Sequence, residues 1–348
     1  MKQSKIVLSA IMLVITLALL VGCSRSGQGE DVQDYPYDIE EHESDQLEEV
    51  EEYIPEQPED IVADSQENPS EITPLLWLVT SPTGQTMYLF GSIHAGDASI
   101  YPLPPYIMDA FNRSSYLAIE ADVLAFERNF EAQIALTLGM MYQDGRTIVD
   151  DIGEDLHQAI SQMFEEHGLP PAMFDGFKPF LWYQTLLSIA LEASGLMAEY
   201  GLDMYFLHVA ESRGMDIIEM ESLEMQTEIF NDFSLPLHIF MIENSMDIPL
   251  MAEGIALLYD AWQRGNKQEL LEIINADYDD MPDELWEEFN NALFIQRDID
   301  MTAKARELMA EGRDVFFVAG LGHFIGDGSI VYLLRQYGYT VEVVSPRG

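Results

Sequence analysis

The sequence predicts a mixed α/β fold, in which a central mixed sheet is built from two strand-GxxH-helix-strand units with a large helical insertion. Short apolar runs typical of strands lie near both ends of the folded region. They cover residues 75–80, 86–90, 116–120, 315–319 and 340–344. Most of the chain between residues about 127 and 311 is instead typical of helices, which places the insertion there.

The first strands form a hairpin. Residues 75–80 and 86–90 are joined by Ser81-Pro82-Thr83-Gly84, in which the proline presets φ and the glycine tolerates a positive φ. Pro104 and Pro105 are favourable first-turn residues for a helix that continues to residue 113. The strand at 116–120 then completes the first unit.

The long middle section reads as helices with one strand among them. Helices over 127–213 stop at the glycine-containing points 168–171, 195 and 214, and a strand follows at 216–220. We expect further helices over 222–275 and 282–311. The second unit comprises the strand 315–319, a helix over 329–337 and the strand 340–344.

Composition excludes several functional classes. The 348 residues include 62 acidic and 16 basic side chains, for a formal net charge of −46. Nucleic acid is therefore not an expected partner, because binding to phosphates needs clustered Lys and Arg. Cys23 is the single cysteine, so no internal disulfide, multi-thiolate zinc site or thiol catalysis is expected in the folded part.

The N-terminus resembles a bacterial lipoprotein signal peptide, residues 1–22. Two lysines precede an apolar run over residues 6–21, which ends in Leu20-Val21-Gly22-Cys23. The alternative, a plain transmembrane anchor, needs roughly 20 apolar residues, more than this run supplies. We expect Cys23 to carry the lipid and to anchor the protein on the outer, extracytoplasmic side of a membrane.

An acidic tether is predicted over residues 23–71. Between residues 30 and 71 there are 18 Asp and Glu, four Pro and no Lys or Arg. Such a segment repels itself and should be extended and disordered. The folded domain is then expected over residues 72–348.

Two matching motifs carry most of the functional argument. A buried strand leads into Gly91-Ser92-Ile93-His94, which is followed by Asp97, and another leads into Gly320-Leu321-Gly322-His323, which is followed by Asp327. If both units are crossovers in one sheet, both histidines lie at the strand ends where open α/β sheets bind ligands. The alternative for each is a histidine that binds only a backbone carbonyl.

A carboxylate joins the two histidines. Side chains alternate along a strand, so Glu120 and Asp122 share one face near the carboxyl end of the strand 116–120. Two imidazoles with one or two carboxylates form a donor set for a divalent ion, with Zn, Co and Mn as candidates. Without a metal, a histidine oriented by Glu120 can still act as a general base.

These residues belong to a pattern that resembles the TraB/GumN family over nearly all of residues 74–346. The matching segments are Leu76-Trp77-Leu78-Val79, residues 88–97, Tyr101-Pro102-Leu103-Pro104, Glu120, Gly201-Leu202-Asp203, Glu221 with Gln226, Arg297, Gly320-Leu321-Gly322-His323 and Gly338-Tyr339-Thr340-Val341. In the Tiki branch, metal-dependent proteases use the two GxxH histidines and a glutamate. The resemblance therefore implies His94, Glu120 and His323 as metal ligands and catalytic residues.

Arg297 is a fourth catalytic candidate, and Glu221, Asp298 and three further aspartates are secondary candidates. Arg297 either holds a substrate carboxylate or oxyanion or forms a surface ion pair. Glu221 either lines the site or caps the next helix, and capping is slightly favoured. The resemblance leads us to expect Asn after Arg297, and the chain has Asp298, which adds negative charge if that position contributes. Asp97, Asp122 and Asp327 complete the secondary set.

Together, these observations predict a lipid-anchored extracytoplasmic hydrolase, a metallopeptidase that acts on peptides or exposed protein termini. The metal would lower the pKa of bound water and polarise the scissile carbonyl, and Arg297 would stabilise the developing negative charge. Two alternatives remain open: a non-catalytic, peptide-binding regulatory lipoprotein similar to pheromone-shutdown proteins, and a metal-free esterase.

Overall fold

A computed structural model describes residues 70–276 and 281–346. The predicted signal peptide, Cys23 and the tether up to residue 69 lie outside the described residues and stay predictions. Ser70, at the start of the described residues, donates hydrogen bonds to the carbonyls of Pro102 and Ile100. No helix in the described part of the chain is both long and apolar enough to span a bilayer.

The core of the fold is a mixed sheet of six strands in the order β4-β3-β5-β2-β1-β6. The strands are β1 (Leu76–Thr80), β2 (Thr86–Ser92), β3 (Tyr116–Ile119), β4 (Asp216–Glu219), β5 (Val315–Gly320) and β6 (Thr340–Val343). β1 runs antiparallel to both of its neighbours, and the other strands are parallel to one another. The carboxyl ends of β4, β3, β5 and β2 therefore meet at one edge.

Both predicted units are present in the sheet. The hairpin of β1 and β2 closes through residues 81–85, where Ser81 N–H donates to the Gln85 carbonyl and Gln85 N–H donates to the Ser81 hydroxyl. The first unit runs from β2 through α3 (Pro105–Arg113) to β3, and the second runs from β5 through α15 (Ile330–Gln336) to β6. Since β2 and β5 are adjacent and parallel, the two GxxH motifs leave the sheet side by side.

Helices make up most of the remaining chain. The shorter ones are α4 (Val123–Glu127), α5 (Phe130–Gly139), α9 (Leu223–Asn231), α10 (Leu235–Asn244), α12 (Lys267–Ala276) and α13 (Asp283–Asn290). The longer ones are α6 (Ile148–Glu166), α7 (Pro179–Ser194), α8 (Leu202–Ser212), α11 (Ile248–Arg264) and α14 (Gln296–Ala310). Asp or Ser side chains cap several of their N-termini, and glycines in the left-handed conformation end α7 and α11.

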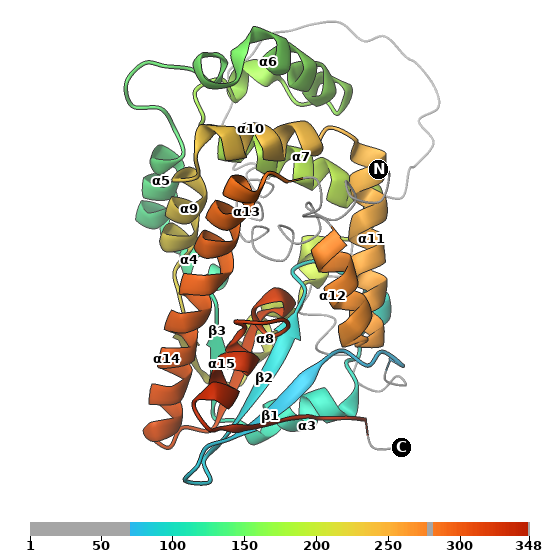
Figure 1. The fold of residues 1–348 in the computed structure, drawn as a ribbon, viewed down its shortest axis with the longest axis vertical. Coiled ribbons are helices and arrows are strands. Elements are labelled where there is room, and N and C mark those ends of the chain that lie inside the picture. Colours follow the sequence, from blue (N-terminus) through green and yellow to red (C-terminus); the bar gives the residue numbers. More distant parts are fainter. Residues whose placement is uncertain (1–69, 277–280, 347–348) are drawn as a thin grey trace, which may run out of the picture.

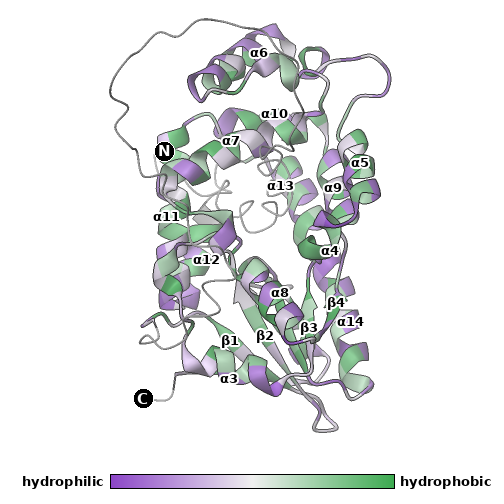
Figure 2. Cartoon of the chain, turned by 180° about the vertical axis from the view of Figure 1, so that it is seen from behind, coloured by the Kyte–Doolittle hydropathy of each residue, from purple (hydrophilic) through white to green (hydrophobic). Residues whose placement is uncertain are grey.

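Helices cover both faces of the sheet. α14 and α15 lie on the face seen in Figure 1, whereas Figure 2 shows α8 on the opposite face. Alternation along β5 supports both layers, because Phe316 packs against Phe111 and Phe206 while its neighbour Phe317 packs against Phe324. All six residues of β5 are buried, as expected of a central parallel strand.

The predicted insertion forms two parts of the molecule, one beyond the carboxyl ends of the strands and one within the layers around the sheet. Helices α6, α7 and α10 lie at one end of the long axis, beyond the carboxyl ends of the parallel strands (Figure 1). In contrast, β4, α8 and α14, which also fall within residues 127–311, belong to the sheet layers. The helices therefore both build the sheet layers and cover the edge where the GxxH motifs end.

His238 in α10 gives the fold a predicted pH dependence. Its side chain is buried and its Nε2 lies 2.9 Å from the carbonyl oxygen of Phe230. Burial lowers the pKa of His238 below its ordinary value of 6.5. The unfolded chain therefore takes up the proton first, and stability falls as pH drops below 6.5. We predict that His238→Gln reduces this loss, by up to about 1.4 kcal/mol per pH unit.

Urea unfolding of the wild type and the variant at pH 7.5 and pH 5.5 measures this effect. His167→Gln, at an exposed position after α6, is the matched control and should follow the wild type. An identical pH dependence of the wild type and His238→Gln would contradict the assignment.

Candidate functional site

Four neighbouring parallel strands each deliver one chemically active side chain to the same edge of the sheet. Glu120 directly follows β3, and Glu221 lies just after β4. The pairing of these strands continues beyond their ends, because Glu221 N–H donates to the Glu120 carbonyl at 2.8 Å. His94 follows β2 and His323 follows β5. The topology therefore brings together residues that are far apart in the sequence.

His94 is held by the first turn of α8. Its Nδ1 lies 2.6 Å from Oδ2 of Asp203, and the Ser92 hydroxyl donates to Oδ1 of the same carboxylate at 2.9 Å. The backbone of α8 approaches closely here, since a Cβ on Gly201 would lie 2.4 Å from the His94 carbonyl oxygen. Leu202 N–H also donates to the Ile93 carbonyl at 3.0 Å. Glycine at position 201 thus permits the contact that places Asp203 against His94.

His323 is held in the same way by α14. Its Nδ1 lies 2.6 Å from Oδ1 of Asp298, which is in the first turn of that helix. The imidazole is completely buried, and the ring of Phe294 packs with its centroid 5.5 Å away. Aspartates, and not backbone carbonyls, bind the Nδ1 atoms of both GxxH histidines. The alternative in which each histidine binds only a carbonyl is therefore wrong.

The other ring nitrogens are buried and available. Neither Nε2 of His94 nor Nε2 of His323 has a hydrogen-bond partner among the described residues. Nε2 of His323 lies 3.9 Å from Oε1 of Glu120. His94 is the more accessible of the two, with 12% of its side chain exposed. Buried nitrogens without partners are rare in folded proteins, which makes this pair notable.

Arg297 connects the two glutamates. Its Nε and Nη2 bind the two carboxylate oxygens of Glu221 at 2.7 and 2.6 Å, and Nη2 also binds Oε2 of Glu120 at 3.1 Å. The amide of Gln226 donates to both glutamates as well. Gly320 N–H completes the set by donating to Oε1 of Glu120. Glu120 is thus fixed from three directions.

A π-helix, Asn291–Ile295, precedes Arg297 and Asp298. Gln296 N–H donates to the carbonyl of Asn291, five residues earlier, which defines the wider turn of a π-helix. Nη1 of Arg297 donates to the Leu293 carbonyl within this segment at 3.2 Å. Such π-turns recur at functional sites, where they direct side chains that a regular helix would place elsewhere. Here the π-turn leads directly into the two residues that α14 contributes.

Burial and local charge set the protonation of the histidines differently. Burial lowers the pKa of His323 well below its usual value, and the positive charges of Arg297 and His94 add to the effect. Burial acts in the same direction on His94, but the Asp203 carboxylate outweighs it and leaves the pKa of His94 raised. His323 is therefore neutral near pH 7, whereas His94 holds a proton more readily.

Burial also affects the carboxyl groups. It raises the pKa of Glu120, against the opposing effect of Arg297, and it raises the pKa of Asp298 well above the ordinary value. The pKa of Arg297 is raised, because Glu221 and Glu120 outweigh the effect of burial. The cluster formed by these residues and the two histidines therefore contains four carboxyl groups, those of Glu120, Glu221, Asp203 and Asp298, and one guanidinium.

The donor chemistry fits a divalent ion. Two imidazole nitrogens without partners and one carboxylate form the set that zinc, cobalt or manganese accepts. Ligands of one ion lie roughly 3 to 4 Å apart, given metal–ligand distances near 2.1 Å, and the distance between His323 Nε2 and Glu120 is within this range. Among the described residues, no group of three His, Cys, Asp or Glu side chains is arranged to hold a metal ion, and the oxygens of Glu120 accept hydrogen bonds from Arg297 and from Gly320 N–H.

Some candidates lie outside this cluster. Asp97 caps the short helix Ala98–Ile100 and Asp122 caps α4. Asp327 is exposed on the loop before α15. For Glu221 the capping interpretation is wrong, because Ser222 caps α9 and Glu221 binds Arg297. The surface ion pair considered for Arg297 is also wrong, because only 1% of this residue is exposed.

Sequence reasoning missed three members of the cluster as site residues, Asp203, Gln226 and Ser92. Ser92 lies within the first GxxH motif, and Asp203 and Gln226 lie in segments that match the family pattern, but the sequence predicts no role for any of them. An aspartate in the first turn of a helix, directly followed by the apolar and aromatic run Met204-Tyr205-Phe206-Leu207, is a signal that could have identified Asp203. Ser92 offered no comparable signal, since a serine at a strand end is common.

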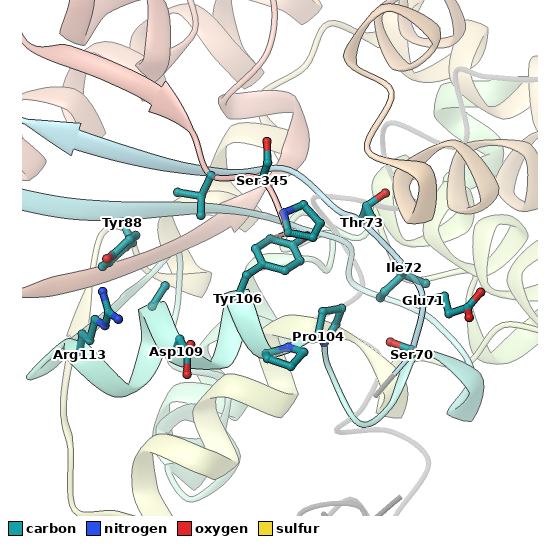
Figure 3. A pocket seen from close by; sticks show the side chains of 14 residues that line it. Ser70, Glu71, Ile72, Thr73, Tyr88, Pro104, Tyr106, Asp109, Arg113 and Ser345 are labelled. Atoms are coloured by element: carbon teal, nitrogen blue, oxygen red, sulfur yellow. The ribbon is translucent and has the colours of Figure 1, made fainter. Parts of the chain in front are cut away.

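Two cavities are present near these elements. One, of about 390 Å³, adjoins the site at Asp298, Phe294 and Gly322 and is otherwise walled mainly by apolar side chains. The other, of about 350 Å³, lies between α3 and the two ends of the domain (Figure 3). In Figure 3, Tyr106 is near its centre and Arg113 lies beside Tyr88 at one end. None of the clustered residues lines this second cavity.

The sequence profile of the TraB/PrgY/gumN family matches residues 75–343, which include the whole cluster. The chain belongs to the TraB/PrgY/gumN family. This membership confirms the resemblance inferred from the GxxH motifs and their surrounding segments. No solved structure matches the chain significantly.

Two kinds of similarity to curated proteins accompany this family membership. The uncharacterized protein YbaP of Escherichia coli is 27% identical over 269 residues, which cover 74% of this chain and 90% of YbaP. Metalloprotease TIKI1 of Xenopus tropicalis is 22% identical over 327 residues, which cover 78% of this chain and 62% of that protein. A metalloprotease TIKI homolog of Nematostella vectensis is 38% identical over 60 residues, 17% of this chain and 13% of that protein. The similarity to Tiki metalloproteases is therefore distant.

The geometry predicts that Arg297 stabilises the fold of this family member. Arg297→Met leaves Glu120 and Glu221 buried without their cation, which should lower the free energy of unfolding by about 3–5 kcal/mol. The matched control is Arg264→Met, because Arg264 pairs with Glu269 at the surface with half of its side chain exposed. This control should cost less than about 1 kcal/mol. Urea unfolding measures both, and equal losses would contradict a special role for Arg297.

Proposed function

We propose that the protein is a hydrolase, a divalent-metal-dependent peptidase whose site comprises His94, Glu120 and His323. One observation carries the proposal: two buried imidazole Nε2 atoms without partners lie at adjacent strand ends, beside a carboxylate. A structural histidine normally satisfies both ring nitrogens when it is buried. Here Nδ1 of each ring lies 2.6 Å from an aspartate oxygen, which resembles the arrangement of metal-binding histidines whose second nitrogen faces a carboxylate.

The charge of the cluster supports a bound cation. The guanidinium of Arg297 is committed to Glu221 and Glu120 and does not contact Asp203 or Asp298 in any described hydrogen bond. Uncompensated carboxylates are costly in a buried site. A divalent cation held by the two imidazoles and Glu120 would offset the excess negative charge.

Such an ion would lower the pKa of bound water and polarise a substrate carbonyl. The protein residues supply the positioning. Arg297, Gln226 and Gly320 fix Glu120, and Asp203 and Asp298 fix the imidazole rings. His94 is the more exposed histidine, so substrate approaches from its side. The donors of Arg297 are mostly occupied, which leaves stabilisation of Glu120, rather than of an oxyanion, as its main contribution.

Peptides are the proposed substrates. The distant similarity to proteins named Tiki metalloproteases supports this class, and the acidic composition of the chain disfavours acidic substrates. The cavity beside Asp298, with Trp286 and Phe294 among its walls, offers room for a side chain next to the site.

A second candidate, metal-free ester hydrolysis, is favoured by the contact between His94 and Asp203. An imidazole oriented by a carboxylate at 2.6 Å, with a raised pKa, is suited to act as a general base. In this case Asp203, and not Glu120 as expected from the sequence, orients the base. Activity would then persist when divalent metals are removed.

The two functions are separated by assaying the full-length chain with peptide and ester libraries, with and without chelator. The proposal predicts stoichiometric bound metal and chelator-sensitive peptide cleavage. His94→Ala and His323→Ala should each reduce the metal affinity and the rate of peptide cleavage by more than about 100-fold. Loss of a residue that only supports a metal ligand costs up to about that factor, so loss of a ligand itself should cost more. His157→Ala is the matched control, because His157 pairs with Asp175 far along the chain from the motifs.

Cleavage that survives chelator would favour the metal-free candidate. Peptide retained intact, without any turnover, would contradict both hydrolases and favour the non-catalytic binding alternative.

A further inference from the structure

We propose that Asp203 is a positioning residue that keeps the His94 proton on Nδ1 and so presents the Nε2 lone pair to the site. This inference deepens the proposed function, on which it rests for its consequence in metal binding. It concerns the tautomer of His94, and that tautomer can be measured directly in the metal-free protein.

The short contact between His94 and Asp203 favours this tautomer. An ionised carboxylate only accepts hydrogen bonds, and Asp203 accepts one from the Ser92 hydroxyl at 2.9 Å. Nδ1 of His94 lies 2.6 Å from the other carboxylate oxygen, a distance at which two lone pairs would repel each other, so Nδ1 carries the proton. A neutral imidazole has a single N–H, so Nε2 is left as an acceptor or ligand.

The position of Asp203 is itself constrained by the backbone. The start of α8 is attached to the GxxH loop by the bond from Leu202 N–H to the Ile93 carbonyl. Gly201 allows this approach, and a side chain there would collide with the His94 carbonyl. Ser92, the last residue of β2, fixes the carboxylate from the other side. A ring held by a carboxylate with so little freedom keeps one orientation.

The second histidine repeats the arrangement. Asp298 contacts Nδ1 of His323 at the same distance, 2.6 Å, and it also lies in the first turn of its helix. Each GxxH motif is therefore paired with an aspartate from the start of a different helix. The contact between an aspartate oxygen and Nδ1 therefore recurs at both GxxH motifs.

Nitrogen-15 NMR of histidine-labelled full-length protein, without metal and at alkaline pH where the rings are neutral, reports which nitrogen carries the proton. The wild type should show His94 protonated on Nδ1. In Asp203→Asn the amide can donate to Nδ1, so the proton should move to Nε2. Asp203→Glu retains an acceptor and should restore the Nδ1 proton. Asp175→Asn, which alters a similar histidine–aspartate pair at His157, should leave His94 unchanged.

Cobalt titration of the same proteins tests the consequence. Asp203→Asn should bind Co²⁺ about 10- to 100-fold more weakly than the wild type, and Asp203→Glu should recover part of this loss. Ser92→Ala, which removes only the support of the carboxylate, provides a milder variant if Asp203→Asn does not fold. It should weaken Co²⁺ binding in the same direction.

Wild-type His94 with its proton on Nε2, or an unchanged Nδ1 proton in folded Asp203→Asn, would overturn the role of Asp203. Failure of the wild type to bind any metal would instead contradict the proposed function, because the tautomer is measured without metal. The two failures are therefore distinguishable.

Discussion

The buried ion pair between Arg297 and the two glutamates is the interaction on which the rest of the site depends. Glu120 and Glu221 end adjacent parallel strands, and their carboxylates meet in the interior because the sheet brings those strands together. Without a cation this arrangement would be strongly unfavourable. Arg297 supplies the charge from α14, so the helix that covers the sheet is fixed to the strand ends by the same contacts that orient Glu120.

That constraint explains how a sheet edge becomes a candidate catalytic site. α14 brings Asp298 with Arg297, and Asp298 holds His323; α8 brings Asp203, which holds His94. The helices thus provide the aspartates that contact the imidazole rings, and the strand ends provide the two histidines and Glu120. The cluster keeps more carboxyl groups than one guanidinium neutralises, and its two free imidazole nitrogens lie among them. Binding of a cation and hydrolysis are the functions that this combination supports best.

The strands of the sheet and three residues of the candidate site could be predicted from the sequence, because the patterns that indicate them are local. Apolar runs, Pro104 with Pro105, and the repeated GxxH motifs identified the strands and their carboxyl ends, and topology rules then brought His94, Glu120 and His323 together. The roles of Asp203, Glu221 and Arg297 could not be predicted in the same way. They depend on how α8 and α14 dock against the sheet, which is decided by close contacts such as Gly201 against His94 and by the π-turn before Arg297.

The central claim is that His94 and His323 present Nε2 to one common ion. X-ray absorption spectroscopy at the cobalt edge of the cobalt-loaded protein tests it most directly, because imidazole rings produce characteristic multiple scattering. The account predicts two imidazole ligands together with oxygen ligands, and one imidazole in either His94→Ala or His323→Ala. A first shell of oxygen alone, or a wild-type spectrum that neither substitution changes, would contradict it.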